Sequence, residues 1–277
     1  MSEDDSNNKL VRVEHMALAL TNFSDNRILS EMVGTSLVLA RVSVTAPVDL
    51  DALVREGKRL YDHQGEKMSE DNIQAFKLFL RAAAAGHSEA QYHLFCCYKK
   101  GFGTQETSVE AEKWLRKAAE NGYPKAMFFL GVAYTSEAVC PTIANNGDEA
   151  IKWLQKAADM GYSTACSLIA EIYKERHIGT EELRWTKEAA LGGCTDSLWK
   201  VKKYYDQSQL ATKDVAEAYA WLLLSADYWS ASQDEAEKIK ASLSSSELER
   251  ANQLYRNYTK KRSQWEQRVE ELRNLYR

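Results

Sequence analysis

Residues 82–226 carry a pattern of apolar positions that recurs at nearly regular intervals. Its clearest mark is a pair of small residues, which begins at positions 82, 118, 157, 189 and 225. A bulky residue stands four positions before each pair, and a glycine stands four positions after the start of each of the first four pairs. The bulky residues are Leu78, Trp114, Trp153, Trp185 and Trp221, and the glycines are Gly86, Gly122, Gly161 and Gly193. Spacings of four place side chains on one helical face, so this pattern predicts one helix of each repeat.

A second series of residues predicts the other helix. Four positions after each glycine stands a small residue, followed at intervals of four by an aliphatic residue and a tyrosine, as in Ala90, Leu94 and Tyr98. Each repeat is therefore predicted to contain two helices, A and B, and the glycine after helix B supplies the left-handed residue that turns the chain into the next helix A. One amphipathic pair cannot bury its own apolar stripe, but stacked pairs create a continuous core, which predicts a solenoid.

This pattern resembles that of the Sel-one-like repeat family, a relative of the tetratricopeptide repeats, with A-x-x-x-L-G-x-x-Y-x-x-G in helix A and A-x-x-W-x-x-K-A-A-x-x-G in helix B. The best unit matches these motifs at Ala90, Leu94, Tyr98, Gly101, Gly103, Ala111, Trp114, Lys117, Ala118, Ala119 and Gly122. It departs from them at Phe95, where the family favours glycine. The resemblance covers about residues 52–226. It implies an all-α protein of bacterial type, an α/α superhelical solenoid of about five helix-turn-helix repeats with a C-terminal helical cap.

The chain divides into three predicted segments. Residues 1–46 form an N-terminal tail and cap segment, for which short capping helices and a small β-hairpin both fit the partly alternating apolar runs. Residues 47–226 form the repeat solenoid. Residues 227–277 form a C-terminal helical cap that ends in a long terminal helix.

Local sequence predicts where two of these helices begin. Asp49 or Asp51 can cap a helix over residues 50–61, because a carboxylate at this position accepts a hydrogen bond from a free backbone N–H. Ser244 and Glu247 match the S-x-x-E capping box. The apolar pattern that follows predicts a terminal helix longer than about 25 residues.

Composition and motifs argue against several functional classes. The formal net charge of −4 is not that of a nucleic-acid-binding protein with a dominant basic face. No apolar run approaches the roughly 20 residues that span a bilayer, so no membrane association is expected. The five cysteines lack C-x-x-C spacing, which predicts reduced thiols in a cytoplasmic protein, with no metal site and no cofactor. No Ser-His-Asp order, phosphate-binding glycine loop or H-E-x-x-H motif is present, so we predict that the protein is not an enzyme.

Helix A carries the candidate binding residues. Stacked A helices line a concave surface in such superhelices, and positions two and six residues after the helix-A alanine lie together, away from the buried stripe. Exposed aromatic side chains there would serve as interface anchors. Packing of the same aromatic residues between repeats is the alternative. The predicted partner-binding residues are Tyr92, His93, Cys96, Phe128, Glu171, Trp199, Lys200 and Lys203.

Basic residues cluster at two places. Lys200, Lys202 and Lys203 could cradle an acidic peptide or a carboxy terminus, although a solvated basic face has the same composition. The run 260–262 in the terminal helix could contact an anionic partner. Self-association of that helix is the alternative, through the apolar stripe of Trp265, Leu272 and Tyr276.

The resemblance implies a non-catalytic scaffold or adaptor that binds a peptide or protein partner on the concave face of the helical array. An alternative role that it also implies is an immunity-type protein that neutralises a secreted bacterial toxin. An active site in residues 10–46 is disfavoured, because a segment of that size can hardly form an independent core.

Overall fold

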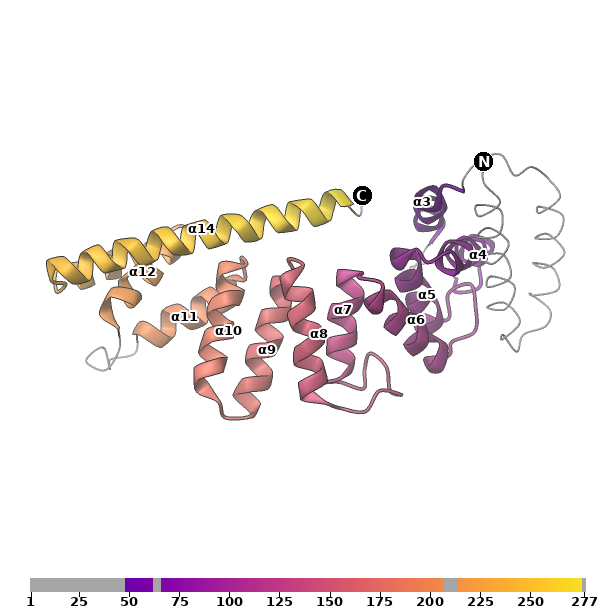
Figure 1. The fold of residues 1–277 in the computed structure, drawn as a ribbon, viewed down its shortest axis with the longest axis horizontal. Coiled ribbons are helices and arrows are strands. Elements are labelled where there is room, and N and C mark those ends of the chain that lie inside the picture. The colour runs from indigo at the N-terminus through magenta and orange to yellow at the C-terminus, as the bar shows by residue number, and fades with distance from the viewer. Residues whose placement is uncertain (1–47, 62–65, 207–213, 276–277) are drawn as a thin grey trace, which may run out of the picture. The chain divides into compact units, whose positions relative to one another are not determined.

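The computed structural model describes residues 48–61, 66–206 and 214–275 (Figure 1). Within these ranges the regular structure is entirely α-helical, which confirms the predicted all-α repeat solenoid. The chain divides into two compact units, residues 1–121 and residues 122–277. The prediction of capping helices or a β-hairpin in residues 1–46 lies outside the described residues, as does Tyr276.

The first unit contains four described helices that pack in chain order, each against the next. The Asp49 carboxylate accepts a hydrogen bond from the backbone N–H of Ala52 at 2.9 Å, so the predicted cap begins the first helix. That helix was predicted over residues 50–61 and ends at Leu60. The helices are α3 (Leu50–Leu60), α4 (Glu70–Ala84), α5 (Ser88–Lys100) and α6 (Ser108–Glu120).

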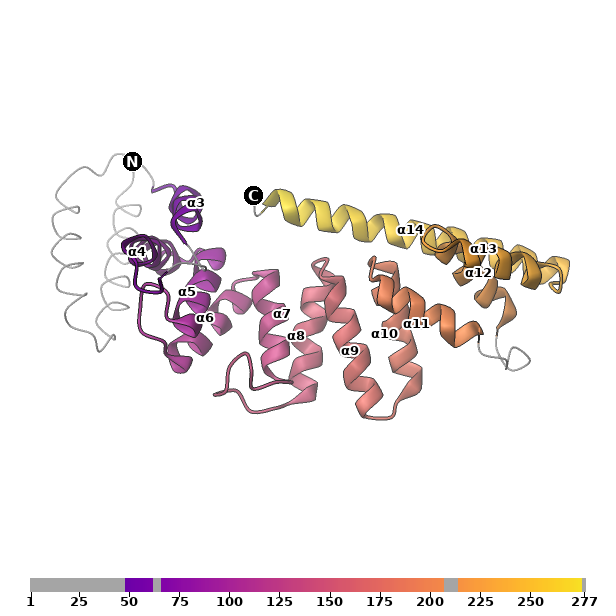
Figure 2. The same ribbon diagram turned by 180° about the vertical axis from the view of Figure 1, so that it is seen from behind.

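In the second unit, consecutive helices also pack in chain order, and a helical cap follows them (Figures 1 and 2). Helices α7 to α12 each pack against the next, and α12 also packs against α13 and α14. The helices are α7 (Pro124–Ala133), α8 (Gly147–Asp159), α9 (Ser163–Glu175), α10 (Gly179–Leu191), α11 (Thr195–Asp206), α12 (Val215–Ala226), α13 (Ser230–Lys240) and α14 (Ser245–Leu275).

Small residues form the centre of both cores, as their spacing predicts. Both members of the four alanine pairs are buried, and so are Leu94, Leu130, Ile169 and Val201 of the A helices. Side chains this small let helix backbones approach closely, while the larger Trp114, Trp185 and Trp221 fill the remaining space. The positions that recur in the sequence repeat are therefore the positions that pack in the core.

Trp153 differs from the other repeat tryptophans. Its side chain is only partly buried, and the next residue, Leu154, is fully buried instead. The ammonium group of Lys156 lies 4.0 Å from the centre of the Trp153 ring, a cation–π contact at the surface. Trp153 is thus less buried than Trp114, although both stand four positions before an alanine pair and both precede a fully buried leucine.

The predicted turn glycines all adopt positive φ angles, from +87° at Gly122 to +100° at Gly161. Gly161 has a second reason to lack a side chain. A Cβ atom there would lie 3.0 Å from Cδ1 of Leu272, so a larger residue would force the Leu272 side chain to shift by a few tenths of an ångström.

Helix α14 begins at the predicted capping box and is 31 residues long. The backbone N–H of Glu247 donates to the Ser244 hydroxyl at 3.3 Å, and the Ser244 N–H donates to the Glu247 carboxylate at 2.8 Å. Trp265, which was predicted to lie on a self-association stripe, is buried in the core of its own unit. The predicted stripe is therefore not available as a whole, because its largest residue packs within the chain.

Among the described residues, no helix combines the length and the apolar character that crossing a membrane requires. Those residues also contain no group of three or more His, Cys, Asp and Glu side chains that could hold a metal ion.

Candidate functional site

A cleft of about 400 Å³ opens between α9, α10 and α11 in the second unit. We call it the α9–α11 cleft. Helix α9 contributes Glu171 and Lys174, α10 contributes Glu182 and Leu183, and α11 contributes Trp199, Lys200, Lys203 and Tyr204. Its volume lies within the range of roughly 300–1,000 Å³ that is typical of ligand pockets.

The helical period of α11 places its residues around the cleft. Leu198, Val201 and Tyr205 are buried and recur at intervals of three and four, so they form the face that packs on the core. Trp199 and Lys203 are four residues apart on another face and point away from that core. The same pattern that folds the helix therefore exposes these side chains.

Two large aromatic side chains at this cleft remain in contact with solvent. Trp199 is 49% exposed and Tyr204 is 42% exposed. The ammonium group of Lys203 lies 5.0 Å from the centre of the Trp199 ring, which is a cation–π distance. Exposed aromatic rings beside a hollow are a frequent feature of protein-binding surfaces, because they offer a large apolar area with little rotamer entropy to lose.

Charged groups surround the aromatic pair. Lys200 Nζ lies 4.0 Å from Glu171 Oε1, and both side chains are more than half exposed. An exposed pair at this distance contributes only about 0–1 kcal/mol, so a partner can replace it at little cost. The cleft as a whole has three lysines, at positions 174, 200 and 203, against two glutamates, at positions 171 and 182. Its charge therefore favours an acidic ligand.

Half of the predicted binding residues come together at this cleft, namely Glu171, Trp199, Lys200 and Lys203. Phe128 lies elsewhere in the same unit, partly buried on α7, with its ring 5.4 Å from that of Tyr162. The other three predicted residues belong to α5 in the first unit.

The prediction that Tyr92 is exposed at a binding surface is wrong, because its side chain is only 5% exposed. Its ring packs against those of His93 and Phe95, at centroid distances of 5.9 and 5.7 Å. His93 in turn stacks on Phe79 at 4.6 Å and is mostly buried, and Cys96 is partly buried. Tyr92 is therefore a buried residue of the first unit and not an exposed anchor.

The predicted cradle of three lysines is also changed. Lys202 Nζ lies 2.9 Å from Glu235 Oε2 of α13, and the lysine side chain is only 15% exposed. Adjacent residues of a helix point in different directions, so Lys202 faces the cap while Lys203 faces the cleft. Lys202 therefore joins α11 to the cap. Lys200 and Lys203 stay at the cleft, where Lys174 joins them.

Sequence reasoning missed Tyr204, Lys174 and the whole contribution of α10. Tyr204 directly precedes Tyr205, and the repeat pattern marks only Tyr205, so it gives no signal for Tyr204. Lys174 stands three residues after Glu171 on the same face of α9, which is a signal that could have been used. The α10 side chains carry no such signal, because their position depends on how α10 packs between α9 and α11.

Comparison with known proteins identifies the repeats. Residues 59–87, 88–123, 124–162 and 203–227 each match the model of the Sel1 repeat. The chain thus contains four matched Sel1 repeats. Sel1 repeat proteins are generally protein-interaction scaffolds. The four matches leave out residues 163–202, so most of the α9–α11 cleft belongs to a helix pair that keeps the repeat architecture with less typical residues.

Similar proteins share either a short segment or the fold. The chain is 39% identical over 62 residues to the chitin synthase regulator SKT5 of Saccharomyces cerevisiae, a match that covers 22% of this chain and 9% of that protein. It is 38% identical over 72 residues to DAP3-binding cell death enhancer 1 of Rattus norvegicus, covering 26% of the chain and 14% of that protein. The chain thus spans a small part of these relatives.

A solved structure supports the architecture over a longer range. The crystal structure of a Sel1 repeat protein from Oxalobacter formigenes superposes with a TM-score of 0.53 at 24% sequence identity. The match covers 79% of this chain and 92% of that one. It shows that the fold is shared.

Proposed function

We propose that this protein is a non-catalytic scaffold that binds a peptide segment of a partner protein in the α9–α11 cleft. The observation that carries the proposal is the exposure of Trp199 and Tyr204 beside a cleft of about 400 Å³. Large aromatic side chains are usually buried in a fold, and those that anchor interfaces are the common exception.

The surroundings of the aromatic pair indicate the chemistry of the peptide. An apolar side chain would fill the cleft between Trp199 and Leu183 and bury both surfaces. A neighbouring carboxylate would meet Lys203 and Lys174, which together with Lys200 give three positive charges against the two glutamates around the cleft. We therefore expect a segment in which an acidic residue adjoins a large apolar residue.

The residues that line the cleft stand at positions where the repeat motif does not require a particular residue. Helices α9 and α11 pack through Ile169 and Val201, which belong to the buried repeat stripe, while Glu171 and Trp199 stand outside it. Substitutions at such positions can change the partner without changing the fold, since stability is carried by the stripe.

Selection from a random peptide library tests the chemistry of the ligand. Peptides that bind the full chain should be enriched in an acidic residue next to a large apolar one. Lys203→Glu should weaken their binding by about tenfold, or about 1.4 kcal/mol, because the new carboxylate repels the acidic residue. Affinity can be measured by calorimetry.

Lys238→Glu is the matched control, because Lys238 is an exposed lysine of α13 outside the cleft. It should leave the affinity of the selected peptides unchanged. Equal weakening by both charge reversals would point to non-specific attraction and would remove the cleft from the account.

A further inference from the structure

Helix α14 has two halves that pack on different helices. In residues 245–258, Ala251 is completely buried against α12 and α13, and the Tyr258 hydroxyl donates to the Glu217 carboxylate at 2.8 Å. In residues 259–275, all of which the structure describes, Trp265 is the single buried residue. We call residues 259–275 the strap.

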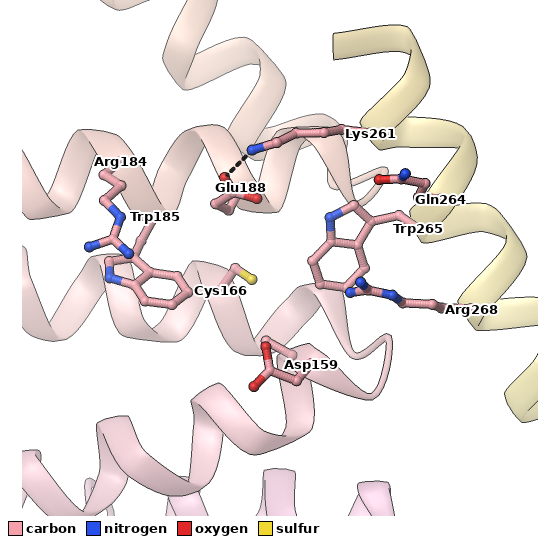
Figure 3. Close-up of a pocket in the computed structure, with 10 residues that line it drawn as sticks. Asp159, Cys166, Arg184, Trp185, Glu188, Lys261, Gln264, Trp265 and Arg268 are labelled. Atoms are coloured by element: carbon pink, nitrogen blue, oxygen red, sulfur yellow. Dashed lines mark hydrogen bonds and ion pairs between the residues drawn. The ribbon is translucent and has the colours of Figure 1, made fainter. Parts of the chain in front are cut away.

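The strap lies across α10 and reaches the turn between α8 and α9 (Figure 3). Lys261 Nζ donates to Glu188 Oε1 of α10 at 3.0 Å, and Trp265 joins the core of the second unit. At the far end, Leu272 approaches Gly161. The contact face of the strap is thus Lys261, Trp265, Arg268 and Leu272, which recur at intervals of four, three and four.

The packing beneath the strap is incomplete. A cleft of about 240 Å³ lies on one side of the Lys261–Glu188 pair, and a second of about 250 Å³ lies on the other. Figure 3 shows the sulfur of Cys166 between the indole rings of Trp185 and Trp265, in the first of these clefts. The ion pair itself is open to water, with Lys261 53% and Glu188 32% exposed. Arg262 adds an ion pair, with its Nη1 3.7 Å from Oδ2 of the exposed Asp227, and a cation–π contact with the Tyr228 ring at 4.9 Å. Ion pairs with an exposed partner hold a helix only weakly.

The junction of the two halves carries hydroxyl groups that bond to the helix backbone. Thr259 donates to the carbonyl oxygen of Arg256 at 2.9 Å, and Ser263 donates to that of Thr259 at 3.1 Å. Side chains that bond back in this way slightly destabilise a helix and often bend it. The helix can therefore yield here while its first half stays packed on α12.

We propose that the strap is a displaceable helix over a second docking surface, formed by α8, α9 and α10, and that an amphipathic helix of a partner protein takes its place. This surface meets the α9–α11 cleft at Leu183 and is otherwise lined by different residues, and the proposal does not depend on the function assigned to that cleft.

The strap itself indicates the chemistry of the partner helix. The surface beneath carries two carboxylates, those of Asp159 and Glu188, against one guanidinium group, that of Arg184, and the strap presents cations on either side of one aromatic ring. A partner helix with an aromatic residue flanked by basic residues one turn away on each side matches both the apolar floor and its charge. Such a helix competes with the strap for the same surface. Its apparent affinity is therefore its intrinsic affinity multiplied by the fraction of molecules in which the strap is open.

Cys166 reports whether the strap is open. Its thiol is buried beneath Trp265, and burial raises its pKa to about 12, so an alkylating reagent meets almost no thiolate in the closed state. Cys140 is an internal control, because it is equally buried but lies between α7 and α8, outside the clefts at the strap. Mass spectrometry of the alkylated full chain follows both thiols in one sample.

In the full chain, Trp265→Ala should speed the alkylation of Cys166 by about tenfold and leave Cys140 unchanged, because the strap opens while the unit stays folded. Lys261→Ala, which removes only the ion pair, should have a smaller effect in the same direction. Lys260→Ala is the matched control, since Lys260 is exposed on the other side of the helix, and it should change neither rate.

A synthetic peptide of residues 256–275 serves as the partner helix. It should restore the protection of Cys166 in the Trp265→Ala chain, and the same peptide with alanine at position 265 should not. Parallel acceleration of Cys140 and Cys166 would show that the unit unfolds as a whole and would overturn the proposal. Failure of the peptide to protect Cys166 would overturn it equally.

Discussion

At the scale of single residues, tryptophan has two roles that depend on the helix face. Trp114 of α6 is buried in the repeat core, with the ammonium group of Lys117 4.7 Å from its ring. Trp199 of α11 is half exposed at the α9–α11 cleft. The sequence predicts the burial of Trp114, which stands four positions before an alanine pair, but for Trp199 it leaves both exposure at an interface and packing between repeats open.

Trp114→Ala should lower the free energy of unfolding by about 3–5 kcal/mol, as expected for truncation of a buried aromatic residue. Trp153→Ala should cost clearly less, because the Trp153 ring is only partly buried. Urea denaturation of the two variants measures the difference. Equal losses would show that the packing at α8 differs from this description.

At the scale of elements, the repeat pattern predicts helices and their buried faces but not the contacts between distant segments. The alanine pairs and turn glycines are confirmed because each acts within its own repeat. The ion pair of Lys202 with Glu235, and the burial of Trp265 beside α10, join segments that share no repeat. An amphipathic helix shows which of its faces is apolar, but the sequence does not show which surface that face will meet.

The junction of α10, α12 and α14 provides a test at this scale. Glu217 of α12 accepts hydrogen bonds from Lys187 of α10 at 2.7 Å and from Tyr258 of α14 at 2.8 Å. Burial alone would raise the pKa of Glu217, but the hydrogen bonds from Lys187 and Tyr258 outweigh it and hold the pKa below its ordinary value of 4.5. The ionised carboxylate therefore stabilises the junction.

Glu217→Gln should lower the free energy of unfolding at neutral pH by about 1–3 kcal/mol, because Lys187 loses its charged partner. A depressed pKa contributes stability above the unfolded value of about 4.5 and loses it as the pH falls through the folded value. The difference between the wild-type chain and the variant should therefore shrink below about pH 4.5. A difference that stays constant down to pH 3 would contradict this assignment.

At the scale of the whole molecule, the protein consists of two helical units, and Sel1 repeats are matched in both. Interaction scaffolding is the general role of such repeats, and the choice of partner is left to positions that the repeat does not determine. The alternative that the chain neutralises a toxin stays a prediction. A neutraliser should bind one protein near nanomolar, whereas an adaptor can work at micromolar affinity.

The most direct test of the central claim is the affinity of a library-selected peptide for the wild-type chain, for Trp199→Ala and for Val109→Ala. Val109 is an exposed apolar residue of the first unit and serves as the control. Trp199→Ala should weaken binding by about 2 kcal/mol, roughly thirtyfold, while the free energy of unfolding changes by no more than about 0.5 kcal/mol. Val109→Ala should bind like the wild-type chain. Wild-type affinity in Trp199→Ala would contradict the account.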